Sequence, residues 1–302
     1  MTTRESISIF NRATGRMEQE RVLGEGLIRF LYEQRYGRFL ANRIFKQRFF
    51  SRLYGIFQDL PLSSRKIVKV AHELEIDLTE AEKPASDYPT FNAFFSRALK
   101  EGARPIDPDP AILVSPCDAR LLVFRDIREE NPIHVKGGCF CLKTLLDSKE
   151  LASRFSGGDL FLYRLCPADY HRFHFPDNSV PGFHRELDGP LHSVNPIALA
   201  SGFPILDHNL RHLTLLNTES AKGEIAMIEI GALCVGSIVQ TYVPNVPILR
   251  GDEKGMFLFG GSSLIVIYEP EKVKIDEDLV EHSAAGIETL VKLGMPIGTF
   301  HR

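Results

Sequence analysis

The segment GMFLFGGSSLIVIYEP, residues 255–270, joins a short run of small residues to a run rich in Val, Ile and Tyr. Its centre, Gly-Gly-Ser-Ser at 260–263, is typical of a tight turn, and residues 263–268 then predict a buried strand. A glycine followed by a serine also has a chemical meaning, because glycine does not shield its carbonyl group and accepts strained backbone. The segment therefore predicts either an ordinary hairpin turn or a reactive peptide bond at the start of a strand.

Short runs of the same kind recur on the N-terminal side of this segment. They are apolar or alternating, and Gly, Pro, Asp and Asn separate them: 120–124, 160–165, 225–230 and 235–242. This spacing predicts a strand-rich region, interrupted by helices only at 142–146 and near 287–293. Three prolines at 105, 108 and 110 precede it. We therefore expect an α+β protein, with an N-terminal helical region over 1–104 and a β-rich core over 105–302, mainly antiparallel and of barrel or sandwich type.

The N-terminal region is basic and aromatic. Between residues 29 and 52 there are seven Arg or Lys and one acid, Glu33, and apolar residues recur near helical spacing. Further helices are predicted over 63–74 and 90–99. A basic amphipathic helix rich in Phe and Tyr is typical of a membrane-surface segment, although an ordinary helix packed on its own domain has the same pattern. The side chains expected to meet a membrane are Arg35, Arg38, Arg43, Phe39, Phe45 and Phe49.

The bulk properties exclude few classes of protein. The chain has 302 residues, a formal net charge of -3 and five cysteines without a C-x-x-C pair, which favours free thiols in a reducing compartment. The first residues lack the apolar run of a signal peptide, and no stretch reaches the length of a spanning helix. A nucleic-acid surface would need a recognised module, and none is found. We expect a peripheral rather than an integral membrane protein.

Two further segments carry side chains suited to chemistry. DYHRFHFP, residues 169–176, contains His171 and His174 between two prolines, so an extended or turn setting is favoured. The two histidines lack an evident third ligand for zinc; they suit acid–base chemistry near neutral pH, or are simply hydrogen-bonded. SPCDA, residues 115–119, places Asp118 just before a strand, as a turn residue or as the carboxylate that orients a histidine.

These side chains together would make the Gly261–Ser262 bond reactive. A serine hydroxyl can attack the preceding carbonyl if a base removes its proton, which turns the amide into an ester. β-Elimination then breaks the chain and leaves dehydroalanine, which hydrolyses to a pyruvoyl group. The base would be a histidine that a carboxylate orients, as in a serine-protease triad.

In these motifs the chain resembles the phosphatidylserine decarboxylase family. The resemblance rests on a Gly-Ser site at 261–262 preceded by a Lys-Gly-x-Phe stretch at 254–257, a Tyr-His-x-x-His block at 170–174 and a Pro-x-Asp motif at 116–118. Other blocks in the family order cover most of the chain: 90–107, 136–146, 194–196, 223–238 and 288–298. Two residues depart from the family pattern. Ser263 stands where Thr is usual and keeps a hydroxyl, whereas Ala119 replaces a common Gly and puts the local turn in doubt.

The resemblance implies a function and a role for each motif. It implies that a triad of Asp118, His174 and Ser262 cleaves the chain between Gly261 and Ser262, giving a large subunit (1–261) and a small one (262–302). Ser262 would become a pyruvoyl group, the electron sink for decarboxylation of phosphatidylserine to phosphatidylethanolamine. His171 would assist decarboxylation or the protonation that follows. The enzyme would act on an anionic membrane surface, at the cytoplasmic face of the cell membrane.

Two other functions fit parts of the same pattern. A serine hydrolase would use Asp118, His174 and Ser262 as a conventional triad in an intact chain, and a non-enzymatic protein on this scaffold would only bind anionic lipid. No metal and no nucleic acid enter any of the three hypotheses. The sequence leaves a homodimer open.

Overall fold

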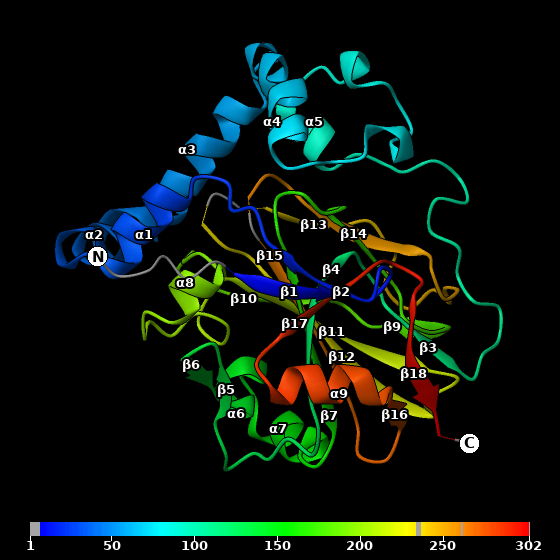
Figure 1. Cartoon of the computed structure of the whole chain (residues 1–302). Helices are drawn as coiled ribbons and strands as arrows, with labels where there is room; N and C mark the ends of the chain where they lie inside the picture. The colour runs from blue at the N-terminus through cyan, green and yellow to red at the C-terminus, as the bar shows by residue number, and fades with distance from the viewer. Residues whose placement is uncertain (1–6, 234–236, 261, 302) are drawn as a thin grey trace.

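The computed structural model describes residues 7–233, 237–260 and 262–301 of the chain (Figure 1). Gly261 and the segment 234–236 lie outside the described residues, so the predicted cleavage bond itself and part of the predicted strand 235–242 are not described.

The core is a large, mainly antiparallel sheet. Its main path runs β10-β11-β12-β15-β7-β4-β17-β1-β2, and β9 pairs with β11 outside this path. Among the described residues, only β1 and β17 pair in parallel within it. The strands are β1 (Ser8–Asn11), β2 (Arg16–Gln19), β4 (Ala119–Phe124), β7 (Asp159–Leu165), β9 (Ser179–Pro181), β10 (Arg185–Leu187), β11 (Arg211–Thr218), β12 (Gly223–Ile230), β15 (Ser262–Tyr268) and β17 (Glu288–Val291). The α+β prediction is confirmed, but the sheet is open, not a closed barrel.

Three small sheets complete the strand inventory of the described residues. One joins β13 (Ile238–Gln240), β14 (Glu253–Phe257) and β8 (Arg172–His174); another joins β16 (Val273–Ile275), β18 (Pro296–Phe300) and β3 (Ile112–Val114). The third is the hairpin of β5 (Ile133–Val135) and β6 (Gly138–Phe140). The first of these sheets matters most for function, because β8 carries His174 and β14 leads to the predicted cleavage site.

Strand β15 lies at the centre of the molecule, between β12 and β7. All of its residues are buried, and they alternate between two apolar clusters: Ile265 and Ile267 face one, Leu264 and Val266 the other. A strand that is buried on both faces has a continuous run of apolar residues in its sequence. This explains why the run at 263–268 predicted a buried strand. The cluster on the Leu264 side includes Phe173 of β8, so the β13-β14-β8 sheet covers that face.

The helices fall into two groups. Over the core lie α6 (Leu142–Leu146), α7 (Lys149–Phe155), α8 (Pro196–Leu199) and α9 (Glu277–Ala284). The N-terminal group comprises α1 (Glu25–Glu33), α2 (Arg35–Leu40), a π-helical turn (Ala41–Phe45), α3 (Arg48–Gln58), α4 (Ile67–Glu73) and α5 (Phe91–Phe95), with 3-10 turns at Pro61–Lys66, Leu78–Glu80 and Ala85–Asp87. This group extends away from the sheet in Figure 1. No helix among the described residues is long and apolar enough to cross a membrane.

Sequence and structure agree for most of these elements. The predicted helix 142–146 is α6, and the one over 63–74 forms as a 3-10 turn followed by α4. Within 90–99, the helix is the shorter α5, which Thr90 caps by accepting a hydrogen bond from the Ala93 amide at 3.1 Å.

Two predictions differ from the structure. The helix expected near 287–293 is wrong, because these residues form β17, which is hydrogen-bonded between β4 and β1; pairing on both sides overrides a weak local preference. Strands β1 and β2 were not predicted either, and they join the core sheet from within the region 1–104. The division of the chain at 104/105 stays a prediction.

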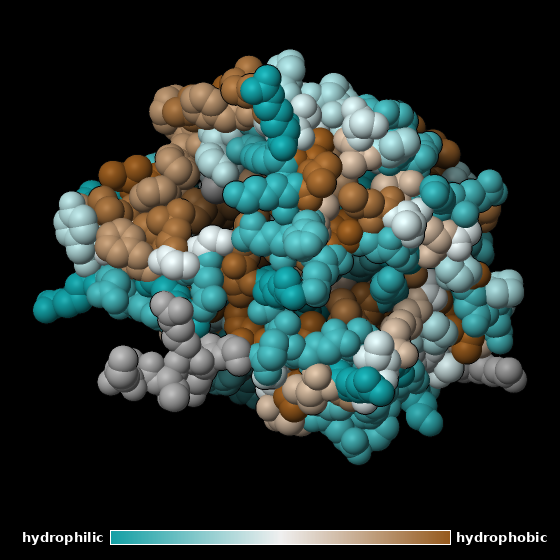
Figure 2. Space-filling view, turned by 45° about the horizontal axis from the view of Figure 1, so that its top comes forward, coloured by the Kyte–Doolittle hydropathy of each residue, from teal (hydrophilic) through white to brown (hydrophobic). Residues whose placement is uncertain are grey.

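The N-terminal helices expose many large apolar side chains. Figure 2 shows hydrophobic residues gathered at the upper left, over these helices. They include Leu27, Phe30, Tyr36, Phe39, Ile44, Phe49, Leu53, Ile56, Phe57, Leu60, Leu62 and Val68. A contiguous apolar surface of this kind is unusual on a soluble monomer and marks a site of interaction.

Candidate active site

Ser262 begins β15 in a fully buried position. It pairs with Leu165 of β7, and Arg120 of β4 pairs with Arg164 of the same strand. If the register between β4 and β7 continues by one residue, Ala119 lies opposite Leu165. Ser262 and Ala119 then lie in one row across the sheet, on the two sides of Leu165 in β7. The Ser262 hydroxyl is buried and has no hydrogen-bond partner among the described residues. An unpartnered buried hydroxyl is costly, and this one lies next to the predicted cleavage bond.

His171 lies beside this row and is completely buried. Its Nε2 atom is 2.9 Å from the carbonyl oxygen of Cys166, the residue after Leu165, and its ring stacks on Phe95 at 3.8 Å between centroids. Burial and then the charge of Arg97 lower the pKa of His171 to about 3. The ring is therefore neutral at ordinary pH, with its proton on Nε2. The Nδ1 atom keeps a free lone pair and has no partner among the described residues.

His174 is held differently, at the end of β8. Its Nδ1 atom is 2.9 Å from the carbonyl oxygen of Gly251, and its Nε2 atom is 3.2 Å from the Tyr170 hydroxyl. Burial lowers the pKa of His174, so this ring too is neutral at ordinary pH. Because a carbonyl oxygen can only accept, Nδ1 carries the proton and Nε2 accepts from Tyr170. Nε2 is therefore the basic atom of His174.

Asp118 occupies the turn before β4, as the sequence indicates. Its carboxylate accepts hydrogen bonds from the Arg104 guanidinium at 2.7 and 3.0 Å and from the Leu293 amide at 2.8 Å. No hydrogen bond joins Asp118 to His174 within the described part of the chain. The orienting contact on the His174 ring comes instead from the Gly251 carbonyl. Asp118 acts on His174 from a distance, since its negative charge favours the protonated ring.

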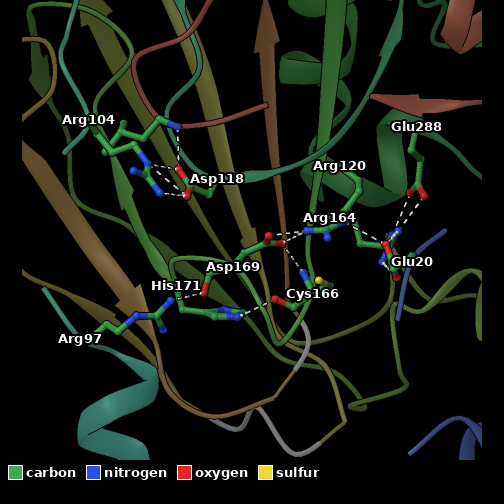
Figure 3. Close-up of polar contacts among 11 residues, drawn as sticks. Glu20, Arg97, Arg104, Asp118, Arg120, Arg164, Cys166, Asp169, His171 and Glu288 are labelled. Atoms are coloured by element: carbon green, nitrogen blue, oxygen red, sulfur yellow. Dashed lines mark hydrogen bonds and ion pairs between the residues drawn. The ribbon is translucent and has the colours of Figure 1, made fainter. Parts of the chain in front are cut away.

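A chain of buried ion pairs supports the segment that carries His171 (Figure 3). Asp169 bonds the Arg120 guanidinium and accepts a hydrogen bond from the Cys166 amide at 2.7 Å. These contacts fix the turn between β7 and β8, and so the position of the His171 ring. The chain continues through Glu20, Arg164 and Glu288. Asp169 lies within the predicted His-containing motif, but nothing in the sequence links it to residues so distant along the chain.

A cavity of about 210 Å³ lies next to this site. Its walls include Leu27 and Ile28 of α1, Tyr54 of α3, Cys166, Phe259 and Gly260. The exposed N-terminal helices and the segment just before Ser262 thus share one mostly apolar cavity. No sequence pattern predicts it, because its walls come from six separate parts of the chain.

The predicted membrane residues are not all exposed. Arg35, Phe39, Arg43 and Phe49 face solvent. Arg38, in contrast, donates to the Ser201 carbonyl at 2.8 Å and lies over the Phe203 ring. Phe45 is half-buried against Phe50. Arg38 and Phe45 therefore anchor the helices to the core, and four of the six residues are available to a membrane.

The site combines a buried serine at the start of a strand, two neutral histidines and an adjoining apolar cavity. These features suit acid–base chemistry on an apolar or amphipathic molecule.

The family model described as phosphatidylserine decarboxylase matches residues 91–299. The phosphatidylserine decarboxylase proenzymes of Fusobacterium nucleatum and Clostridium botulinum (strain Alaska E43) are each 41% identical to the chain over 97% of its length and 98% and 99% of theirs. That of Desulfitobacterium hafniense is 40% identical over 98% of this chain and 99% of its own. The chain belongs to the phosphatidylserine decarboxylase family.

Proposed function

We propose that this chain is a carboxy-lyase that decarboxylates phosphatidylserine with a pyruvoyl group made from Ser262. Family membership supports the reaction, and the relatives' description as proenzymes supports processing of the chain. The observation that carries the proposal is the Ser262 hydroxyl, which is buried without a partner in the described structure and lies at the start of the central strand. A small group formed from this side chain fits the same place.

Cleavage begins when the Ser262 Oγ atom attacks the carbonyl carbon of Gly261 and a base accepts the hydroxyl proton. The carbon–nitrogen bond between the two residues breaks as the ester bond forms, and the freed nitrogen takes up a proton. Removal of the Cα proton of residue 262 then expels the Gly261 carboxylate, which ends the large subunit. The dehydroalanine left behind takes up water and loses ammonia, so residue 262 becomes the pyruvoyl end of the small subunit.

His174 is the proposed base for the first step. The Gly251 carbonyl holds its proton on Nδ1, so Nε2 is free to accept one. The charge of Asp118 stabilises the imidazolium that forms. Tyr170, bonded to Nε2 at 3.2 Å, must release that atom or pass the proton to it.

His171 is proposed to serve the second reaction. The pyruvoyl group, once formed, supplies a ketone that accepts electrons during decarboxylation of an α-amino acid. The neutral His171 ring, fixed by its bond to Cys166, presents an unused Nδ1 lone pair that can hold and deliver a proton. Burial raises the pKa of the neighbouring Cys166 thiol, so the thiol stays protonated and does not compete as a nucleophile.

The two subunits are proposed to stay together after the cut. Strand β15 of the small subunit is hydrogen-bonded to β12 and β7 of the large one along its whole length. Its side chains face both apolar clusters. Cleavage would remove one covalent bond and leave this pairing intact.

The exposed helices are proposed to bring the site to a lipid surface. Arg35 and Arg43 would meet anionic head groups, and Phe39 and Phe49 would enter the acyl boundary. The cavity between α1, α3 and Gly260 would then connect the surface to the site. Such a protein would be peripheral, at the cytoplasmic face of the membrane.

A denaturing mass spectrum of the purified protein tests the proposal. We expect two fragments, 1–261 and 262–302, with a small fragment that lacks a free amino terminus. Ser262→Ala should give an intact chain of about 34.0 kDa without activity. Ser263→Ala is the matched control, because Ser263 is equally buried but faces the opposite side of the sheet, and it should still be cleaved.

The same samples separate the other functions. An intact wild-type chain that reacts with a fluorophosphonate at Ser262 would favour a serine hydrolase. Vesicle binding without release of carbon dioxide, and without sensitivity to hydroxylamine, would favour a lipid-binding protein.

A further inference from the structure

Arg97 is a buried cation that pairs with no carboxylate of the described residues. Arg120 and Arg164, which are also buried, each pair with two carboxylates. Arg211 donates to three carbonyl oxygens. Arg97 makes one long hydrogen bond to the residues that the structure describes, 3.4 Å from its Nη2 atom to the Asp169 carbonyl oxygen. Its Nε and Nη1 atoms have no hydrogen-bond partner in the described part of the chain.

An unbalanced cation in this position is costly to the folded protein. A buried charge is normally paired, because removing it from water is unfavourable unless a counterion replaces the water. The Phe94 ring, 5.0 Å from the Arg97 guanidinium carbon, compensates only in part. Burial accordingly lowers the pKa of Arg97. Two sets of unused donors on a buried guanidinium indicate that an anion from outside the chain completes this site.

The location of Arg97 connects it to the proposed reaction. Its hydrogen bond goes to Asp169, two residues before His171, and Phe95, two residues before Arg97, stacks on the His171 ring. Figure 3 shows the guanidinium pointing toward His171. The positive charge of Arg97 also contributes to the low pKa of His171. An anion bound to Arg97 would therefore lie beside His171, the residue proposed to serve the decarboxylation.

We propose that Arg97 binds the phosphodiester group of the lipid substrate. This proposal rests on the proposed function, and it names a substrate-binding residue for the same site. The substrate also carries a carboxylate, but that group leaves as neutral carbon dioxide. A cation bound to it would stabilise the ground state more than the transition state and slow the reaction. The phosphodiester keeps its charge throughout, so binding it orients the substrate without that cost, and guanidinium groups suit phosphate oxygens.

Phe259 lies between the cavity and Phe95, which is on the segment that carries Arg97. Its ring lines the cavity and packs on Phe95 at 5.0 Å. Cleavage after Gly261 would place Phe259 two residues from a new chain end. The loss of that covalent restraint would let the ring move and admit the head group, so substrate binding at Arg97 would follow processing.

Competition experiments on the processed enzyme test this site. The measured quantity is the inhibition of phosphatidylserine turnover in vesicles by two soluble compounds. Glycerophosphoethanolamine has the phosphodiester but no carboxylate, and serine has the carboxylate but no phosphate. In Arg97→Gln we expect inhibition by glycerophosphoethanolamine to weaken about 10- to 100-fold, the effect of losing charge-assisted hydrogen bonds, while inhibition by serine is unchanged. Lys100→Gln removes an exposed charge from the same segment and should behave as the wild type.

Each alternative result has a defined meaning. Weaker inhibition by serine alone would assign Arg97 to the carboxylate and overturn the proposal, and unchanged inhibition by both compounds would also overturn it. Equal weakening of both, with reduced thermal stability, would assign Arg97 a structural role. If Arg97→Gln does not fold, Arg97→Lys keeps the charge without the planar guanidinium and should lose about tenfold. If neither variant folds, the wild type is treated with phenylglyoxal, which modifies arginine side chains. We then expect glycerophosphoethanolamine to protect Arg97 from this modification, and a lack of protection would overturn the proposal.

The mass of the chain is recorded for every sample. An uncut wild-type chain would overturn the proposed function itself. A cleaved and active Arg97→Gln chain with wild-type inhibition would overturn only the phosphodiester site.

Discussion

Strand β15 and helix α3 are both rich in apolar residues, yet the fold treats them in opposite ways. Every residue of β15 is buried between two apolar clusters. In α3, Phe49 is 77% exposed, Ile56 53% and Phe57 56%. The core thus satisfies its apolar side chains internally, whereas the N-terminal helices leave theirs uncovered. Helix α3 thus carries exposed apolar side chains on which the proposed membrane contact depends.

Charged residues show the same contrast. In the core, Arg104, Arg120 and Arg164 each bond carboxylates. On the helices, the Arg35 and Arg43 guanidinium groups form no hydrogen bond or ion pair with any residue that the structure describes. The core charges therefore fix geometry, whereas the charges of Arg35 and Arg43 remain available to an external anionic surface. This division of roles predicts that chemistry and membrane binding can be disrupted separately.

The largest expected effect concerns cleavage and depends on the core alone. His174→Ala should leave the chain uncut, because loss of the histidine base from a serine triad lowers the rate by about 10⁶-fold. His171→Ala should still be cleaved, at least in part, but should lose decarboxylation. Mass spectrometry gives cleavage, and release of carbon dioxide gives turnover. Arg35→Gln/Arg43→Gln on the helices should be cleaved like the wild type.

The reverse result would exchange the two roles. The Nδ1 atom of His171 has no partner among the described residues, whereas Tyr170 occupies Nε2 of His174. An uncut His171→Ala chain together with a cleaved His174→Ala chain would therefore identify His171 as the base. Loss of cleavage in Arg35→Gln/Arg43→Gln would contradict the independence of the two regions.

Much of this contrast could be predicted from the sequence. The apolar run 263–268 predicts a central strand because burial on both faces removes alternation, and β15 confirms it. The basic aromatic pattern predicts the N-terminal helices. The segment 287–293 could not be predicted correctly, because β17 owes its conformation to hydrogen bonds with β4 and β1. The exposure of Arg38 could not be predicted from the sequence either. Its partners Ser201 and Phe203 lie far from it along the chain.

The site could be predicted in its components but not in its contacts. Asp118, His171, His174 and Ser262 come from sequence motifs, and their roles stay predictions. The hydrogen bond from Arg104 to Asp118, and that from His174 to Gly251, depend on tertiary packing. Arg97 had no signal of its own in the sequence, because only the structure reveals that it is buried without a counterion.

A smaller effect should appear in the pH dependence of stability. Burial lowers the pKa of His171 to about 3 and those of His192 and His212 to about 4. Below about pH 6.5 the unfolded chain binds protons that the folded chain does not, so the free energy of unfolding falls as the pH falls. For His171 alone this loss is about 2 kcal/mol between pH 7 and pH 5. In His171→Gln, the free energy of unfolding measured with urea should therefore fall less between pH 7 and pH 5 than in the wild type.

The helix region offers the control for this measurement. His72 lies exposed on α4, and His72→Gln should keep the decrease seen in the wild type. The pH dependence of stability would then come from the core histidines. An unchanged decrease in His171→Gln would mean that His171 is protonated in the folded protein, which would remove its neutral ring from the proposed mechanism.

The smallest expected effect concerns membrane binding and depends on the helices alone. Each cation near an anionic surface contributes about 1 kcal/mol, so the loss of two in Arg35→Gln/Arg43→Gln should weaken binding to phosphatidylglycerol vesicles about 30-fold. Vesicle co-sedimentation at low salt measures this, and added salt should reduce the difference by screening. The matched control is Lys143→Gln/Lys149→Gln, which removes two exposed charges from α6 and α7, on the opposite side of the molecule from the N-terminal helices in Figure 1.

Equal weakening in both double variants would show that net charge, rather than the helix surface, governs binding. Unchanged binding in Arg35→Gln/Arg43→Gln would leave the apolar side chains as the source of affinity. Phe49→Ser then decides, because Phe49 is the most exposed of the large apolar residues on these helices. If Phe49→Ser also binds like the wild type, the membrane surface must lie elsewhere on the protein. The exposed apolar face of the helices would then need another partner.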